Sequence, residues 1–257
     1  MSTDDRSLDW YNEHAEEYTS HVRNPDDSIY HSLYEKPAMY NLLPDLNGKS
    51  VISLGCGSGE DCNYIKQHGA SNVVGIDISE QLLKAASSAY PKCDFKLMNM
   101  EDLAFDNGSF DFAYSSLAIH YIENWSKTFN EVYRVLKPNS YFLFSCEHPV
   151  FSAMQITQND KNIKVRQLSR TLQRDTNEVT IIGDYLTHRA IAEEFGMAVT
   201  TWHKPIGEIV AEATQARFLI ANIHEPKPLP KMEELSPKDY ATLTKIPEFI
   251  IFNLYKK

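Results

Sequence analysis

The chain comprises 257 residues, 42% of them hydrophobic, and carries a formal net charge of −10. This length and composition allow a substantial core, organised as one large domain or two small ones. The acidic balance argues against sequence-independent nucleic-acid binding, which depends on lysine and arginine side chains that neutralise phosphates.

The cysteines and the apolar runs indicate the compartment. Cys56, Cys62, Cys93 and Cys146 form no CxxC pair and no zinc-type spacing. We interpret them as reduced, small apolar residues, typical of a reducing compartment, and expect no metal site. The N-terminus lacks a hydrophobic leader, and no later run is long enough to cross a bilayer. We therefore expect a cytoplasmic protein without a membrane span.

A polar segment opens the chain and two helices follow. We expect residues 1–8 to be disordered. The spaced aromatic residues of 10–18 predict a helix, and a second helix at about 32–43 ends before a proline. The first helix either packs on the protein as an ordinary amphipathic helix or forms a lid, in which Tyr11 or Tyr18 closes over a ligand.

A glycine-rich turn follows the first predicted strand. Apolar residues at 50–54 predict the strand, Gly55, Gly57 and Gly59 follow at every second position, and a helix is expected at 60–68. Glycines let the backbone approach a ligand without interference from a Cβ atom. The free N–H groups of a new helix favour an anionic group.

A second apolar strand, at about 72–77, ends in Asp77. In a βαβ unit this acid lies beside the first turn, where it can accept hydrogen bonds from ribose hydroxyls. A nicotinamide dinucleotide is a rival ligand. Its fingerprint needs a third glycine where this chain has Glu60, whose charge would repel the pyrophosphate. The pattern therefore favours a nucleoside that carries little negative charge.

The rest of the chain alternates strands and helices. We expect further strands at 94–98, 110–115, 141–144 and 217–223, and helices that start after Ser79, at about 124 and within 202–206. This alternation predicts a parallel, doubly wound sheet. Residues 150–203 interrupt it with a polar insertion. The insertion is either a mobile loop or a cap over the strand ends, where open α/β sheets bind ligands.

Several segments resemble the motifs of class I S-adenosylmethionine-dependent methyltransferases. They are Ser53–Gly59, Val74–Ser79, Asn99–Phe105 with Asn107–Asp111, and Glu131–Pro138. Their order and spacing match the family over roughly residues 9–150. The resemblance implies a Rossmann-like α/β fold, with a doubly wound, seven-stranded, mostly parallel sheet whose last strand, at 246–252, is antiparallel.

The resemblance also implies a division of the chain and a cofactor. We expect an N-terminal helical lid at 1–45, a cofactor-binding core at 46–150, a substrate cap at 151–203 and the rest of the core at 204–257. The cofactor is S-adenosyl-L-methionine. The residues implied to bind it are Tyr11, Tyr18, Gly55, Cys56, Gly57, Asp77, Ile78, Asn99, Met100, Glu101, Ser116 and Leu117.

Four positions depart from the family pattern. Asn99 stands where an aspartate is common, but an amide oxygen can still accept a hydrogen bond from the adenine amino group. Ser53 stands where an acid usually helps to bind the methionine amino group, so that contact is weakened or moved to another residue. Asn139 and Arg217 stand where glycines are common. Asparagine tolerates the left-handed backbone region, so we expect little loss at Asn139.

The leading hypothesis is an enzyme that methylates a small-molecule acceptor by in-line transfer, similar to the enzymes of ubiquinone and menaquinone biosynthesis. Such a reaction depends mainly on holding the reacting atoms in line. A general base is needed only if the acceptor loses a proton, and His120, His148 and His203 are the candidates. The alternative is a non-catalytic sensor or partner subunit that binds the cofactor. The sequence leaves the oligomeric state open.

Overall fold

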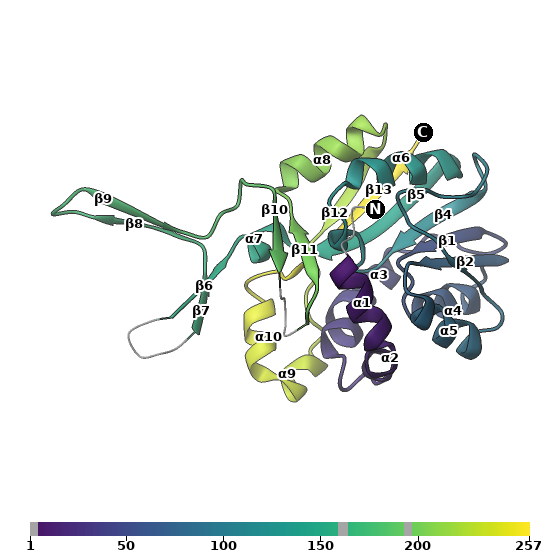
Figure 1. Cartoon of the computed structure of the whole chain (residues 1–257), viewed down its shortest axis with the longest axis horizontal. Coiled ribbons are helices and arrows are strands. Elements are labelled where there is room, and N and C mark those ends of the chain that lie inside the picture. Colours follow the sequence, from purple (N-terminus) through teal and green to yellow (C-terminus); the bar gives the residue numbers. More distant parts are fainter. Residues whose placement is uncertain (1–4, 159–163, 193–196) are drawn as a thin grey trace.

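The computed structural model describes residues 5–158, 164–192 and 197–257. Its centre is a seven-stranded sheet in the order β12-β13-β5-β4-β1-β2-β3 (Figure 1). Only β13 runs antiparallel to the other six strands. The strands are β1 (Ser50–Leu54), β2 (Asn72–Asp77), β3 (Asp94–Leu97), β4 (Phe110–Ser115), β5 (Leu136–Glu147), β12 (Leu219–His224) and β13 (Phe249–Lys256). The predicted α/β, Rossmann-like architecture is confirmed.

Helices cover both faces of the sheet because the central strands are apolar on both sides. On β1, Ile52 and Leu54 belong to the core under α6 (Trp125–Val135) and α8 (Ile206–Gln215). Val51 points the other way, into the core under α3 (Lys36–Asn41) and α4 (Glu60–Gln67). The helix α5 (Glu80–Ala89) begins at Ser79, whose hydroxyl accepts a hydrogen bond from the Leu82 N–H as predicted for a helix cap.

Two N-terminal helices, here called the lid helices, cross the carboxyl end of the sheet. They are α1 (Asp5–Glu13) and α2 (Ala15–Arg23). The expected disorder of residues 5–8 is wrong, because α1 begins at Asp5; residues 1–4 lie outside the described part. Side chains tether the lid helices: the Ser79 hydroxyl donates to Asn12 Oδ1 over 2.8 Å, and Arg23 Nε donates to Glu60 over 2.7 Å.

The second predicted helix is split by an irregularity. Residues 31–35 form a π-helix, η1 (His31–Glu35), which continues directly into α3. A π-helix adds a residue to the turn and is often found at functional sites. Its last residue, Glu35, is completely buried.

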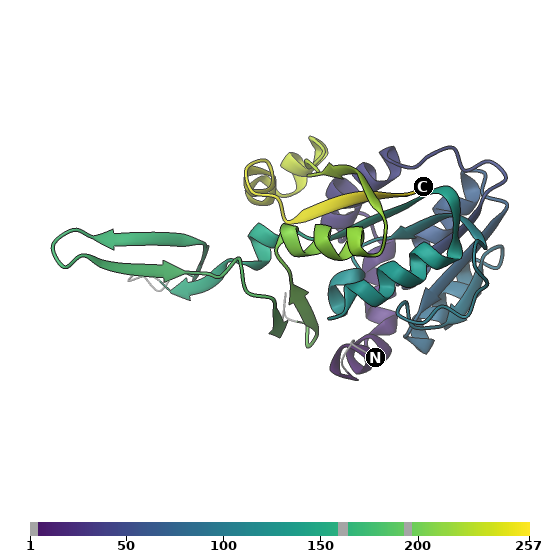
Figure 2. The same cartoon turned by 90° about the horizontal axis from the view of Figure 1, so that it is seen from above.

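The polar insertion forms three separate β-hairpins after the short helix α7 (Pro149–Ser152). Two of them project away from the core (Figure 2) and only the third, beside the lid helices, reaches the carboxyl end of the sheet (Figure 1). The expectation that the whole segment covers the strand ends is therefore too broad. The hairpins are β6 (Gln155–Gln158) with β7 (Lys164–Gln167), β8 (Ser169–Gln173) with β9 (Glu178–Ile182), and β10 (Arg189–Ala192) with β11 (Thr200–His203).

The C-terminal part differs from the expectation in two places. The predicted surface connection at 225–237 includes α9 (Lys231–Leu235) and leads into α10 (Pro237–Leu243), and the last strand begins at Phe249 rather than 246. Asn139 adopts φ 61° and Arg217 φ 72°, so both take the left-handed conformation of a glycine. The Arg217 guanidinium lies 4.4 Å from the centre of the Tyr133 ring, a cation–π contact.

Tight packing against β2 gives a test of the core. A Cβ atom at Gly75 would lie within 2.8–2.9 Å of Cys56, Cys62 and Phe95 side-chain atoms. We expect Gly75→Ala to lower the free energy of unfolding by about 1–3 kcal/mol, the usual cost of overpacking. Gly207→Ala is the matched control, since nothing lies within 4 Å of a Cβ there and alanine favours helix. Urea unfolding of both variants measures the difference, and equal stabilities would contradict this account of the packing.

Candidate active site

A cavity opens at the carboxyl ends of β1, β2 and β4, beneath the lid helices. It comprises about 680 Å³ of space not filled by atoms, part of it open to solvent. Ten of the twelve residues predicted to bind a cofactor line it; Cys56 and Glu101 do not. The lining residues are Ser7, Tyr11, Tyr18, Gly55, Gly57, Asp77, Ile78, Leu82, Met98, Asn99, Met100, Ser116, Leu117, Ala118, Tyr121 and Ile122.

The glycine turn forms the floor of the cavity. Gly55 has φ 62°, and a Cβ atom there would lie 2.3 Å from the Cβ of Ala118, so only glycine fits. The Cys56 N–H donates to the Ile76 carbonyl over 2.9 Å, which ties the turn to β2. A Cβ on Gly75 would meet the Cys56 sulfur, so this thiol packs toward the core and Cys56 serves the turn through its backbone.

Asp77 stands at the end of β2 with its carboxylate in the cavity wall. Its Oδ2 accepts from the Gly57 N–H over 2.8 Å, and its Oδ1 accepts from the Ser79 N–H over 2.9 Å. Burial raises the pKa of Asp77 above its ordinary value, although these backbone donors oppose the shift. An acid fixed in this way offers its remaining lone pairs to hydroxyl groups in the cavity.

Three tyrosines roof one side of the cavity. The Tyr11 hydroxyl donates to the Tyr121 hydroxyl over 2.8 Å. The Tyr11 ring meets Tyr18 and Tyr121 edge to face, at 5.3 and 5.6 Å between ring centres. Burial raises the pKa of Tyr11 and of Tyr18, so both phenols stay neutral. Aromatic groups of this kind suit a ligand that carries a positive charge.

Another part of the wall comes from the segments after β2 and β3 and is mostly apolar. Met98, Met100 and Ile78 line it together with Asn99. Asn99 Oδ1 accepts from the Glu101 N–H over 3.0 Å, and its amide donates to the Glu101 carboxylate over 3.2 Å. Glu101 is therefore behind the wall, where it orients Asn99 rather than facing the cavity.

Sequence reasoning missed Glu35, which lies directly beneath the predicted Ser116 and Leu117. One carboxylate oxygen accepts from the Ser116 hydroxyl over 2.9 Å and from the Ser145 hydroxyl over 2.5 Å. The Ser145 oxygen in turn accepts from the Leu117 N–H over 2.9 Å, and Leu117 has φ 48°. The other Glu35 oxygen has no hydrogen-bond partner among the described residues. Glu35 thus positions two residues of the cavity wall.

The environment of Glu35 opposes its charge. Burial and nearby Asp61 raise its pKa to about 7, while the two serine hydroxyls and Lys36 oppose the shift. The sequence does contain one signal that could have revealed Glu35: it is a single acid on the otherwise apolar side of the helix predicted at 32–43. Tyr121 and Ser7 were also missed: Tyr121 follows a predicted candidate, and Ser7 fell in the segment expected to be disordered.

The three candidate histidines do not converge on the cavity. His148 accepts from the Val150 N–H at Nδ1, and its Nε2 lies 3.0 Å from Glu225. His203 Nδ1 lies 2.7 Å from the Ser152 hydroxyl, and its Nε2 lies 2.9 Å from the Tyr185 carbonyl. The His203 ring thus joins two parts of the insertion, whereas the His148 ring joins the start of α7 to the segment after β12.

His120 is different, because it lies in the short 3₁₀ helix η2 (Ile119–Tyr121) and is followed directly by the cavity residues Tyr121 and Ile122. Its Nδ1 is buried and has no hydrogen-bond partner among the described residues. Burial lowers the pKa of His120 to about 3, so the ring is neutral at physiological pH. Of the three histidines, only His120 adjoins the cavity wall.

Charge limits the ligands that the cavity can take. Its wall contains Asp77 and neither a lysine nor an arginine, so a pyrophosphate would find no counter-charge there. Glu60, taken from the sequence as the group that repels a pyrophosphate, is bound by Arg23 and by the Ser58 hydroxyl. The exclusion of a dinucleotide therefore rests on the missing basic residues rather than on Glu60.

Comparisons with known proteins agree with this geometry. The model of the methyltransferase domain family matches residues 52–144. An uncharacterized protein of Haemophilus influenzae is 32% identical over 203 residues, which are 76% of each chain. The crystal structure of an S-adenosylmethionine-dependent methyltransferase from Mesorhizobium loti has a TM-score of 0.73 at 26% identity, covering 90% of this chain and all of that one. The chain belongs to the class I S-adenosylmethionine-dependent methyltransferases.

A more distant relative has a named substrate. The phthiotriol/phenolphthiotriol dimycocerosates methyltransferase 1 of Mycobacterium ulcerans is 28% identical over 169 residues, which are 64% of this chain and 60% of that protein. As a member of the family, this chain is an S-adenosylmethionine-dependent methyltransferase. Within the described residues, no helix is long and apolar enough to cross a membrane. The same residues contain no cluster of histidine, cysteine or acidic side chains that could hold a metal ion.

The cavity fits the cofactor of this methyltransferase family. S-Adenosylmethionine supplies an activated methyl group on a positively charged sulfur. Gly55 leaves space that any Cβ atom would fill. Asp77 would offer acceptors to the ribose, and the methionine and isoleucine wall would suit the adenine. The neutral tyrosines would provide aromatic groups for the cationic centre, and Glu35 fixes the Ser116–Leu117 turn in the cavity wall.

Asp77 provides the first test of the site. Asp77→Ala removes the acceptor for ribose hydroxyls, and a hydrogen bond to a charged group contributes roughly 1.5–3 kcal/mol. We expect the affinity for S-adenosylhomocysteine to fall by about tenfold to a hundredfold. Asp102→Ala, at an exposed acid outside the cavity wall, should bind like the parent. Isothermal titration calorimetry measures both, and an unchanged dissociation constant in folded Asp77→Ala would reduce Asp77 to a turn residue.

Glu35 provides a pH-dependent test. Its pKa in the folded state, about 7, lies above its ordinary value of 4.5, so the folded protein binds the proton more tightly than the unfolded one. The protonated Glu35 side chain therefore stabilises the folded protein at low pH. As the pH rises from about 4.5 to about 7 this contribution is lost, which lowers the free energy of unfolding by up to about 3 kcal/mol. Glu35→Gln cannot ionise, so we expect it to lack this loss and to gain stability over the parent at pH 8.

The measurement is urea unfolding of both proteins at pH 5 and pH 8. Groups other than Glu35 titrate in both proteins, so the difference between the two pH profiles isolates the carboxyl group. Parallel profiles would show that Glu35 does not titrate in this range.

Proposed function

We propose that this methyltransferase acts on a small-molecule acceptor. The observation that carries the proposal is the roof of the cavity, in which Tyr11 and Tyr18 of the lid helices meet Tyr121 from the sheet side. A concave cavity that is covered in part by side chains suits a ligand that can be surrounded better than an extended polymer. The net charge of −10 further disfavours nucleic acid.

The acceptor side of the cavity lies toward the third hairpin of the cap. The Thr200 N–H of β11 donates to the Ser7 hydroxyl over 2.9 Å, and Ser7 is part of the cavity wall. This contact supports the proposal that residues 151–203 contribute to acceptor binding, through β10 and β11. The lid at 1–45 and the core at 46–150 would then hold the cofactor, with 204–257 completing the core.

The protein mainly has to exclude water and hold the acceptor in line. The tyrosine roof excludes water, and the Glu35 network fixes Ser116 and Leu117. Placement of the reacting atoms can by itself contribute much of the rate enhancement. If the acceptor must lose a proton, His120 is the candidate among the three histidines because its ring packs beside that of the cavity residue Tyr121, although burial lowers its pKa and makes it a weak proton acceptor.

The finer proposal is an apolar acceptor that carries a hydroxyl group. The apolar wall and the neutral phenols of the cavity support it, as does the M. ulcerans relative, whose name gives phthiotriol and phenolphthiotriol dimycocerosates as substrates. A phenolic quinol of the ubiquinone or menaquinone type meets the same description and rests on the sequence resemblance.

The experiment compares acceptor classes directly. The enzyme is incubated with methyl-labelled S-adenosylmethionine and, separately, with an organic-solvent extract, a low-molecular-weight filtrate, total RNA and total protein from cells. We expect label in one of the two small-molecule pools and not in RNA or protein. Asp77→Ala is the matched control and should incorporate little label in any pool. Enzyme-dependent label in RNA or protein alone would overturn the proposal.

A further inference from the structure

Glu35 is an acid that is buried in the core without a cation to balance it. Its side chain is completely buried, and one of its oxygens has no hydrogen-bond partner among the described residues. The neighbouring cation, Lys36, forms its ion pair with Asp61, over 3.3 Å. A buried and unpaired charge costs folding free energy, so an acid in such a place beside a cavity is a candidate for function.

Four titratable groups face Glu35 from the elements packed around it. Lys36 and Tyr40 belong to α3, Asp61 to α4 and Tyr114 to β4. Burial raises the pKa of both phenols, so they stay neutral. Lys36 and Asp61 carry opposite charges and pair with each other. Among the described residues, these elements therefore supply no net charge that would offset an ionised Glu35.

Ser116 connects this acid to the cofactor cavity. It lines the cavity and donates its hydroxyl proton to Glu35 over 2.9 Å. A serine hydroxyl has one proton and two lone pairs, so the Ser116 oxygen is left to accept a hydrogen bond from a ligand. The Leu117 N–H is also engaged, by the Ser145 oxygen over 2.9 Å. This corner of the wall thus offers an acceptor backed by a buried acid, which suits a cationic donor.

The strand faces place Glu35 on the same side of the sheet as Ser53. Side chains alternate along a strand, so Ser53 points to the face of Val51, which packs under α3. Ser145 lies on that face as well, two residues after Leu143 of the same core. Glu35 directly precedes α3 and contacts Ser145 from the helix side. A carboxylate is thus present on this face although position 53 carries a serine.

We propose that Glu35 supplies the counter-charge for the amino group of the cofactor's methionine part, acting through the Ser116 hydroxyl. Glu35 is then a positioning residue, because the side chain that would touch the cofactor is Ser116. Asp77 is the only acid among the described residues of the cavity wall, and it is assigned to the ribose. Glu35 would therefore make up for the acid that is missing at Ser53. The proposal depends on the cofactor of the family and not on the identity of the acceptor.

The experiment combines a change in the protein with a change in the ligand. Isothermal titration calorimetry at pH 8, above the Glu35 pKa of about 7, compares S-adenosylhomocysteine with its deaminated analogue, which keeps the carboxylate and lacks the amino group. We expect Glu35→Gln to weaken the binding of S-adenosylhomocysteine by about tenfold or more. The binding of the deaminated analogue should change by less than about twofold, because the cycle isolates the coupling between the two groups.

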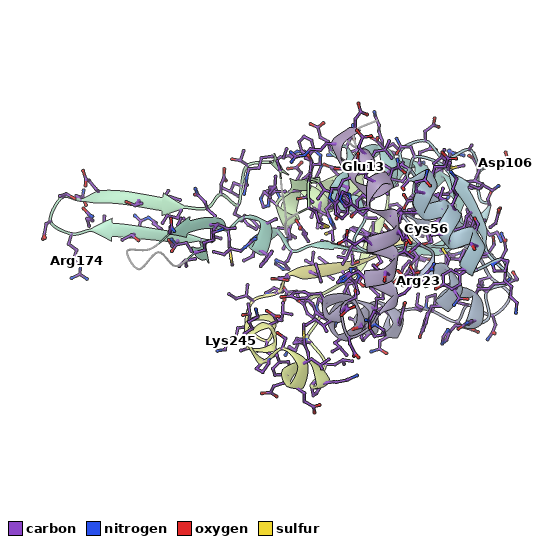
Figure 3. All side chains as sticks on the ribbon, turned by 60° about the horizontal axis from the view of Figure 1, so that its bottom comes forward. Glu13, Arg23, Cys56, Asp106, Arg174 and Lys245 are labelled. Carbon is purple, nitrogen blue, oxygen red and sulfur yellow. The ribbon has the colours of Figure 1, made fainter. Side chains whose placement is uncertain are left out.

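Glu178→Gln is the matched control, because it makes the same change at an exposed position. Glu178 belongs to the hairpin of β8 and β9, whose turn at Arg174 lies far from Cys56 in the glycine turn (Figure 3). This variant should bind both ligands like the parent. Glu35→Gln is expected to be more stable than the parent at pH 8, so a loss of folding would not explain weaker binding.

Proton release provides a readout that a purely structural role would not produce. A cation beside Glu35 favours its ionised form. Because its pKa is about 7, the binding of S-adenosylhomocysteine to the parent at pH 7 should release up to about half a proton. Calorimetry in buffers with different ionisation enthalpies measures this release. It should be absent with the deaminated analogue, which shares the ribose that Asp77 is predicted to bind, and absent in Glu35→Gln.

Three results would overturn the proposal. Equal losses of affinity for the two ligands in Glu35→Gln would make Glu35 only a support of the cavity wall. An unchanged affinity of this variant for S-adenosylhomocysteine would remove Glu35 from cofactor binding. A parent protein that binds S-adenosylhomocysteine at pH 7 without releasing a proton would show that the amino group does not meet the charge of Glu35. Methylation of RNA or protein would contradict the proposed acceptor and leave these outcomes unchanged.

Discussion

The turn at Gly55–Gly57 is the constraint on which the cavity depends. Its backbone is held to β2 by the Cys56 N–H at Ile76 and by the Gly57 N–H at Asp77. At Gly55 the turn touches Ala118, which follows β4, so closely that a Cβ atom has no room. Three strand ends are thus fixed relative to one another by contacts of only a few atoms, and the shape of the floor follows from them.

Much of the fold could be predicted because its signals are local. The strands at 50–54, 72–77 and 110–115 are apolar runs bounded by turn residues, and their limits agree with the structure. Ser79 marked the start of α5 through a capping preference that depends only on its neighbours. The hairpins of the insertion were not predicted, because their strands are short, polar and paired only with each other. Pairing of that kind leaves no core-facing pattern in the sequence.

The site was predictable where the backbone itself forms it. Gly55, Gly57 and Asp77 stand in a motif whose spacing fixes their geometry, and all three line the cavity. Glu35 escaped prediction because its partners, Ser116 and Ser145, lie 81 and 110 residues away in sequence. His148 and His203 were plausible catalytic residues by position, but sequence could not show that their ring nitrogens are engaged by Glu225, Ser152 and Tyr185.

The lid helix α1 is fastened at both of its sides, to Ser79 through Asn12 and to Thr200 through Ser7. The first contact lies beside Asp77, the residue predicted to bind the ribose, and the second lies at the hairpin of β10 and β11. If α1 has to move to release spent cofactor, it also gives up its contact with β11, so the cofactor side of the cavity and the cap would open together. Opening of α1, rather than the methyl transfer itself, would then limit turnover.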